Sequence, residues 1–203
     1  MQTTLPALPL AEGPDAERRL WLAATGTAGA AAAMATAVPF ISTLAPSERA
    51  RALGAAVEVD IGDIPPGGLK TVEWRGKPVW VMRRTPEMLA ALQGQEAQLA
   101  DPQSDKAQQP ESARNPGRSL RPELFVAVGI CTHLGCSPTA VPAGSPNPSV
   151  GPAWQGGFFC PCHGSTFDLA GRVFKNKPAP TNLEVPPYRY LSDSRIVIGE
   201  ETA

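Results

Sequence analysis

Every cysteine and every histidine of the chain falls within residues 131–163, and this clustering limits the possible folds more than any other feature. The chain has four cysteines and two histidines. Cysteines that only filled a core would be scattered, and would not accompany the only histidines. The whole set is therefore better explained by shared chemistry than by packing. The two clusters are Cys131-Thr132-His133-Leu134-Gly135-Cys136 and Cys160-Pro161-Cys162-His163-Gly164-Ser165.

Each cluster offers a cysteine and a histidine two or three residues apart, on a stretch that contains glycine and, in the second cluster, proline. Two cysteines and two histidines are the ligands that a mixed-ligand 2Fe–2S centre needs. Two thiolates can hold one iron and two imidazoles the other. The two remaining cysteines can then bridge the loops.

Zinc is the main alternative, because two cysteines and two histidines also suit a tetrahedral zinc site. Zinc modules, however, usually space their ligands as C-x2–4-C and H-x3–5-H, whereas these clusters read C-x-H and C-x2-H. Zinc would also leave two cysteines unexplained, which a disulfide in an exported domain would use. Two disulfides beside unligated histidines would not explain why both histidines lie here.

Residues 20–47 contain no Asp, Glu, Lys or Arg. A helix needs about 20 apolar residues to cross a bilayer, so this run is long enough even if Pro39 kinks or ends it. A cleaved signal peptide and a buried core helix are the alternatives. A retained membrane anchor is favoured, and its small residues suit close packing against a partner helix.

The pair Arg18-Arg19 before this run resembles a twin-arginine export signal, although two flanking charges would look the same. Arg49 and Arg51 follow the run, so the positive-inside rule gives nearly a tie. A twin-arginine signal would export the domain already folded, with its cofactor inserted. We therefore expect residues 18–45 to form a signal-anchor transmembrane helix.

The remaining segments are expected to be a polar N-terminal tail (1–17), a tether (46–56) and an all-β head (57–203). A helical extension of the anchor is the alternative for the tether. The chain has 23 prolines, which favours short strands and long ordered loops. Residues 94–119 are predicted to be a mobile surface loop or insertion. The net charge of −1 gives no sign of a nucleic-acid partner.

Several patterns within the head predict strands. Residues 57–61 alternate apolar and polar side chains. Residues 69–74 and 77–82 flank Arg75-Gly76, a hairpin turn. Thr85-Pro86-Glu87 can cap a short helix through Leu92. Further strands are expected at 124–130, 156–159 and within 183–198, so that two strands run directly into the two clusters.

Taken together, residues 131–136 and 160–165 resemble the two loops that bind the iron–sulfur cofactor in the Rieske family. They are most similar to those loops in the subunits of cytochrome bc complexes. The resemblance extends to Gly171-Arg172, to 178–180 and to 183–188, and back to the N-terminal anchor. It covers most of the chain except 94–119 and 139–155. It implies an all-β Rieske head with a cluster-binding subdomain and one short helix, behind one N-terminal transmembrane helix.

The resemblance implies one 2Fe–2S cluster and a ligand set for it. Cys131 and Cys160 would bind the inner iron as thiolates. His133 and His163 would bind the outer iron and face solvent. Imidazoles in place of thiolates make the cluster less negative, which raises its reduction potential. Their ring nitrogens can also exchange protons.

The same resemblance assigns the surrounding residues. Cys136 and Cys162 would form a disulfide between the loops. Ser165 is similar to a serine that donates a hydrogen bond to a cluster sulfide. Residues 178–180 resemble a proline loop that covers the other side of the cluster.

The function implied is that of a subunit of quinol–cytochrome c reductase, an oxidoreductase and translocase. Its catalytic edge would be His163 and His133, with His163 meeting the quinol. The implied partners are cytochrome b and a c-type cytochrome in a dimeric complex. The protein would cross the bacterial inner membrane once, with its head in the periplasm. The Rieske subunit of a periplasmic molybdenum oxidase such as arsenite oxidase, a soluble Rieske ferredoxin and a zinc scaffold are the alternatives.

Two positions depart from the family pattern. Phe167 stands where higher-potential members carry a tyrosine whose hydroxyl donates to a ligand sulfur. Because hydrogen bonds to cluster sulfurs raise the potential, we expect a lower potential here. Lys177 stands where glycine is usual, next to the proline loop.

Overall fold

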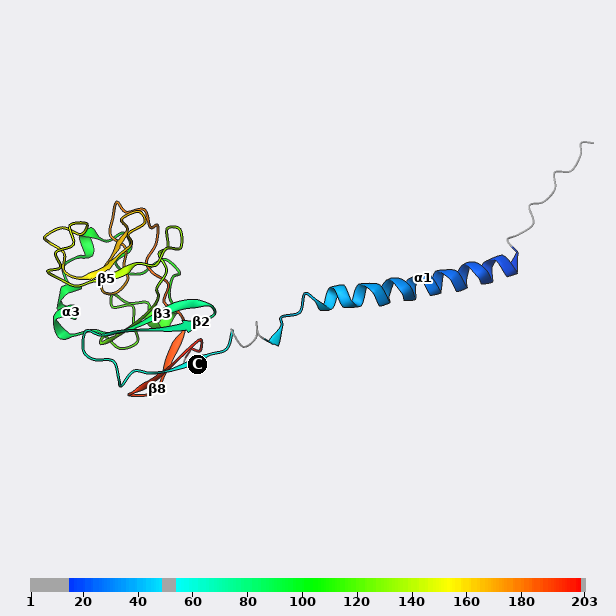
Figure 1. The fold of residues 1–203 in the computed structure, drawn as a ribbon, viewed down its shortest axis with the longest axis horizontal. Coiled ribbons are helices and arrows are strands. Elements are labelled where there is room, and N and C mark those ends of the chain that lie inside the picture. The colour runs from blue at the N-terminus through cyan, green and yellow to red at the C-terminus, as the bar shows by residue number, and fades with distance from the viewer. Residues whose placement is uncertain (1–14, 49–53, 202–203) are drawn as a thin grey trace, which may run out of the picture. The chain divides into compact units, whose positions relative to one another are not determined.

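A computed structural model describes residues 15–48 and 54–201 of the chain (Figure 1). The chain divides into two compact units, Met1–Arg49 and Ala50–Ala203. The predicted tail (1–17) lies almost entirely outside the described residues, as do residues 49–53 in the middle of the predicted tether.

The first unit contains one long helix, α1, spanning Ala16–Ser42. Asp15 caps it by accepting a hydrogen bond from the Glu17 N–H. Pro39 does not end the helix, which continues to Ser42. None of its residues is buried within the chain, which argues against a core helix. At 27 residues it spans about 40 Å, and it is long and apolar enough to cross a membrane.

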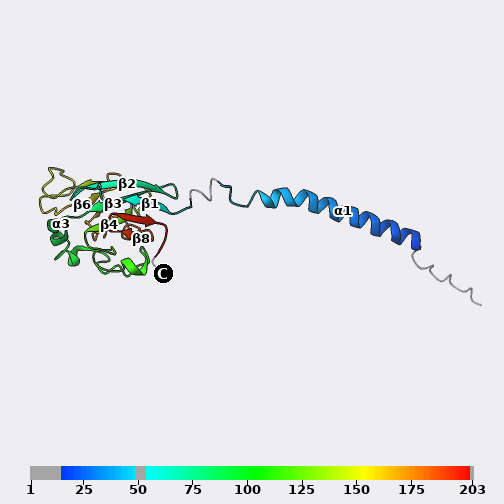
Figure 2. The same cartoon turned by 90° about the horizontal axis from the view of Figure 1, so that it is seen from below.

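Three antiparallel three-stranded sheets build the second unit, the head, which confirms the predicted all-β fold (Figure 2). The first sheet has the order β1-β9-β8, with Val57 of the first strand paired to Ile198 of the last. The second has the order β2-β3-β4, and the third β5-β6-β7. The strands are β1 (Val57–Asp60), β2 (Leu69–Trp74), β3 (Lys77–Arg83), β4 (Leu124–Val128), β5 (Thr139–Val141), β6 (Gly157–Phe159), β7 (Thr166–Phe167), β8 (Tyr188–Ser192) and β9 (Arg195–Ile198).

The predicted hairpin is confirmed. Trp74 pairs with Lys77, and the two turn residues Arg75 and Gly76 both have positive φ, 52° and 70°. This is the conformation of the two-residue turns that match the twist of a hairpin. The short helix α3 (Pro86–Ala91) follows, and the Thr85 hydroxyl caps its Met88 N–H.

Aromatic packing joins the second sheet to the third. Trp80 of β3 stacks on Phe158 of β6 with ring centroids 4.8 Å apart. A Cβ at Gly129 would lie 2.3 Å from the Trp80 ring, so only glycine fits there. All five residues of β4 are buried. The chain therefore continues from a strand that is buried on both faces into the first cysteine–histidine cluster.

A buried ion pair fixes the turn that follows the second cluster. Arg172 and Asp168 meet at 2.7 Å with both side chains fully buried. Arg118, also fully buried, donates to the carbonyls of Ala170 (3.3 Å) and Leu183 (2.7 Å). Burial lowers the pKa of Arg118 to about 10, which still leaves the guanidinium charged at pH 7. The buried Arg118 side chain thus connects the turn that contains Ala170 to the segment that contains Leu183.

Residues 94–119 differ from the mobile loop that their composition predicted. They contain two short 3-10 helices, Glu96–Gln98 and Glu111–Ala113. Leu99, Ser104 and Ala113 are almost completely buried. The segment is ordered because its backbone and polar side chains bond to the rest of the head, as described below.

Candidate iron–sulfur centre

The first of the two predicted metal-binding loops, residues 131–136, closes on itself shortly after β4. The Cys131 N–H donates to the Cys136 carbonyl at 2.7 Å, and the Gly135 N–H donates to the Cys131 carbonyl at 3.0 Å. Gly135 has a φ of 83°, a left-handed conformation that favours glycine. The loop therefore turns tightly around its first cysteine.

The second metal-binding loop, residues 160–165, follows β6 and has the same frame. The Cys160 N–H donates to the Ser165 carbonyl at 2.8 Å, and the Gly164 N–H donates to the Cys160 carbonyl at 3.0 Å. Gly164 has a φ of 77°. The two loops are thus backbone equivalents, although their cysteines and histidines are spaced differently.

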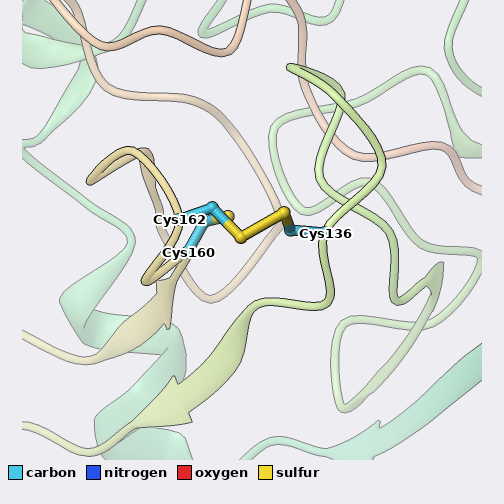
Figure 3. A group of neighbouring side chains, drawn as sticks. All are labelled: Cys136, Cys160 and Cys162. Carbon is cyan, nitrogen blue, oxygen red and sulfur yellow. A yellow bond between two sulfur atoms is a disulfide. The ribbon is translucent and has the colours of Figure 1, made fainter.

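A disulfide between Cys136 and Cys162 joins the two loops (Figure 3). The Cys160 sulfur lies close to it, since the sulfur atoms of all three cysteines are within 4.8 Å of one another. Cys136 and Cys162 have no thiolate to offer while they are bonded to each other. These three cysteines are therefore not a metal site by themselves.

The donors that remain lie in two layers. Cys131 and Cys160 are free and buried. The rings of His133 and His163 lie edge to face, with their centroids 4.8 Å apart. His133 is half-buried and His163 is exposed. Each of the two loops therefore carries one free buried thiol and one less buried imidazole, and the two imidazole rings are in contact with each other.

Burial raises the pKa of the Cys131 thiol, and the neighbouring Cys160 acts in the same direction. The backbone N–H of His133 and the hydroxyl of Ser165 lower this pKa, but by less than burial and Cys160 raise it. Without a metal, Cys131 therefore stays protonated at neutral pH. A metal must displace this proton on binding.

Ser165 connects this thiol to the proline loop, residues 178–180. Its side chain is fully buried, and its oxygen accepts the Ala179 N–H at 3.0 Å. On the other side, the Thr132 hydroxyl donates to the Thr181 carbonyl at 2.7 Å. The proline loop is thus bonded to the second metal-binding loop, and the residue that follows it is bonded to the first. The sequence did not reveal the part played by Thr132, because its partner is a backbone carbonyl.

Neither metal-binding loop carries a charged side chain. From Thr132 to Phe167 the sequence has no Asp, Glu, Lys or Arg. Leu134, between His133 and Gly135, is 72% exposed. Phe167, in β7, is fully buried and offers no hydroxyl to the site.

Comparison with known proteins agrees with this geometry. Residues 56–188 match the family model of the Rieske [2Fe-2S] domain. The chain is 57% identical over 184 residues to a "Ubiquinol-cytochrome c reductase iron-sulfur subunit" of Allochromatium vinosum, covering 91% of this chain and 88% of that protein. This chain belongs to the Rieske iron–sulfur family.

Other members of the Rieske family are similar over comparable lengths. A protein of the same name from Rhodospirillum rubrum is 43% identical over 189 residues, covering 92% of this chain and 94% of that protein. One from Bradyrhizobium diazoefficiens is 41% identical over 177 residues, covering 87% of this chain and 90% of that one. As a Rieske protein, the chain carries one 2Fe–2S cluster.

The donors present fit this cofactor. A Rieske centre needs two sulfur and two imidazole ligands. The head offers two free buried thiols and two neighbouring imidazoles, on two loops with the same backbone frame. A four-thiolate cluster does not fit, because Cys136 and Cys162 are bonded to each other.

Proposed function

We propose that this chain is the electron-transfer subunit of a respiratory quinol–cytochrome c reductase. It takes an electron from quinol at cytochrome b, with release of a proton, and passes the electron to a c-type cytochrome. One observation carries the proposal: two imidazoles lie in contact, one of them exposed, on the same two loops that carry two free buried thiols. The relatives named above support it, since each is named as the iron–sulfur subunit of such an enzyme.

In this proposal Cys131 and Cys160 hold the inner iron, and His133 and His163 hold the outer iron. The thiols are buried and the imidazoles are not, which agrees with that order of depth. When bound, the cluster supplies a one-electron acceptor, with a potential in the range of about −150 to +300 mV that is general for Rieske centres.

His163 is the residue proposed to meet the quinol, because it is exposed while His133 is half-buried. With one ring nitrogen on the iron, its other nitrogen can, once deprotonated, accept a hydrogen bond from the quinol hydroxyl and so orient the proton that must leave. The exposed Leu134 adds apolar contact on the first loop. Loops with these side chains suit a pocket that admits an apolar quinone ring.

The proposed assembly is a dimeric complex with cytochrome b and the c-type cytochrome in the bacterial inner membrane, where electron transfer is coupled to proton translocation. Helix α1 is proposed as the retained single-pass anchor, with Arg18-Arg19 as the export signal. The head is then on the periplasmic side, where a disulfide such as Cys136–Cys162 persists.

An alternative as the Rieske subunit of a molybdenum oxidase is not favoured. The relatives described above are similar over most of their length, and all carry the name of the quinol-oxidising enzyme.

The proposal is tested by low-temperature electron paramagnetic resonance of dithionite-reduced membranes, with and without a quinol-site inhibitor. A Rieske signal that changes with the inhibitor is expected. A Rieske signal that is the same with and without the inhibitor would argue against a quinol site. Membranes that give no Rieske signal would argue against the proposed ligand set.

The tether proposed at 46–56 has its own test. If the head must travel between two partners, stiffening this segment with prolines will slow turnover and leave the resonance spectrum unchanged. Equal turnover in the stiffened variant would refute a moving head.

A further inference from the structure

One part of the ordered 94–119 segment, residues 99–109, lies along the chain that carries the proline loop; we name it the strap. The Ala100 N–H donates to the Val173 carbonyl at 2.9 Å, and the Val185 N–H donates to the Gln108 carbonyl at 2.8 Å. Leu99, at the start of the strap, forms a bridge with Phe174. The strap is therefore bonded to the chain on both sides of residues 178–180.

Asn182 forms a second connection just after the proline loop. Its side chain is fully buried, donates to the Asp101 carbonyl at 3.0 Å and accepts the Val173 N–H at 2.9 Å. This amide fixes the end of the loop against the strap.

Lys106 makes the strap's contact with the proline loop itself. Its ammonium donates to the Pro180 carbonyl at 2.9 Å. The lysine backbone is fixed first: the Asp101 carboxylate accepts its N–H at 3.1 Å, and the Gln109 amide donates to its carbonyl at 2.9 Å. The ammonium therefore starts from an ordered position rather than from a free loop.

The opposite side of the proline loop faces the metal donors. The Ala179 N–H, next to Pro180, donates to the Ser165 hydroxyl at 3.0 Å, and Ser165 is near enough to Cys131 to lower the pKa of its thiol. Lys106 thus lies at one end of a short series of contacts through Pro180, Ala179 and Ser165 that ends at a free thiol.

We infer that Lys106 is a positioning residue for the iron–sulfur centre, which holds the proline loop against Ser165 from outside. The inference rests on the ligand set proposed above. Removal of the ammonium releases the Pro180 carbonyl, loosens the Ala179–Ser165 hydrogen bond and takes a positive charge away from this side. Both effects disfavour the more negative, reduced cluster, so the reduction potential falls.

The test compares Lys106→Met with Lys106→Arg in the full-length chain within its complex. Lys70→Met is the control, because the Lys70 ammonium also donates to a backbone carbonyl, that of Asp60 at 2.9 Å, and pairs with Asp63, but in β2 rather than beside the proline loop. The readouts are the midpoint potential from a redox titration and the rate at which a chelator removes iron.

The expected result is a lower potential for Lys106→Met, with iron released roughly threefold to tenfold faster, the range for losing one exposed hydrogen bond. Lys106→Arg and Lys70→Met are expected to match the parent chain. An unchanged potential in Lys106→Met, with only a lower melting temperature, would show a merely structural role and overturn the inference.

A second redox titration in 1 M salt separates the effect of the Lys106–Pro180 hydrogen bond from the effect of the lysine's charge. Screening shortens the Debye length to about 3 Å there, which removes a long-range charge effect. If the reduction potential of Lys106→Met stays below that of the parent chain in 1 M salt, positioning through Pro180 is supported. If this difference in potential disappears, the inference is overturned. Failure of the proposed function looks different, since the parent chain itself would then lack a Rieske signal.

Discussion

The two metal-binding loops share a backbone but use it differently. In both, a buried cysteine comes first and a glycine of positive φ comes fifth, with matching hydrogen bonds. The sixth residue is Cys136 in the first loop and Ser165 in the second. Cys136 forms the disulfide with Cys162, the third residue of the second loop, whereas the buried Ser165 hydroxyl accepts the Ala179 N–H. The shared frame thus holds the two free thiols, while the sixth position carries the covalent link in the first loop and a hydrogen bond to the proline loop in the second.

The largest effect is expected where the loops are alike, at the first cysteine. Replacing Cys160 with serine, or Cys131 with serine, removes a thiolate that no other free sulfur can replace, so iron content and the resonance signal fall to near zero. Ser149→Ala, at an exposed position, is the control. A retained cluster in either variant would contradict the shared role of the first position.

The disulfide is the next feature to break. The Cys136→Ala and Cys162→Ala double variant removes a link across 26 residues, which lowers the free energy of unfolding by about 3 kcal/mol. Denaturant unfolding of the oxidised and the double-variant heads measures this. Equal midpoints would mean that the two loops are held together without the covalent link.

Ser165 is the sixth residue of the second loop, and replacing it tests the proposed hydrogen bond to a ligand sulfur. Ser165→Ala removes a donor to a ligand sulfur, a loss of about 1.5 kcal/mol that corresponds to about 60 mV for a one-electron couple. The potential is expected to fall by about this amount in a redox titration. Ser137→Ala, at an exposed position beside the first loop, is expected to leave it unchanged. A fall in both variants would argue against a specific hydrogen bond.

The smallest effect is expected beyond the second loop. Phe167→Tyr adds a hydroxyl at a fully buried position, and a weak hydrogen bond to a ligand sulfur would raise the potential by about 30 mV. Phe174→Tyr, at a half-buried position, is the control. No rise in Phe167→Tyr would refute the explanation offered for this departure from the family pattern.

Much of the fold could be read from the sequence because its strongest signals are local. The Arg75-Gly76 turn and the Thr85 cap depend on neighbouring residues, and both occur as predicted. Strands β5 and β7 were missed, because three and two residues are too few to show a periodic pattern.

The site was less accessible to sequence reasoning. The cysteine and histidine spacing indicated a metal and its ligand types, but the equivalent frames of the two loops depend on backbone hydrogen bonds that no side-chain pattern encodes. The 94–119 segment was expected to be mobile because it is rich in polar residues. It is ordered because long-range contacts, such as that of Asn182 with Asp101, satisfy those groups.

The pairing of β1 with β9 has a mechanical consequence. The head's first strand begins at Val57 and lies against Ile198, close to the last described residue of the chain. A pull on the head through residues 46–56 is therefore borne first by the hydrogen bonds between its first and last strands. The two metal-binding loops belong to the connections of the other two sheets, so they are not the part of the head that the chain from α1 enters first.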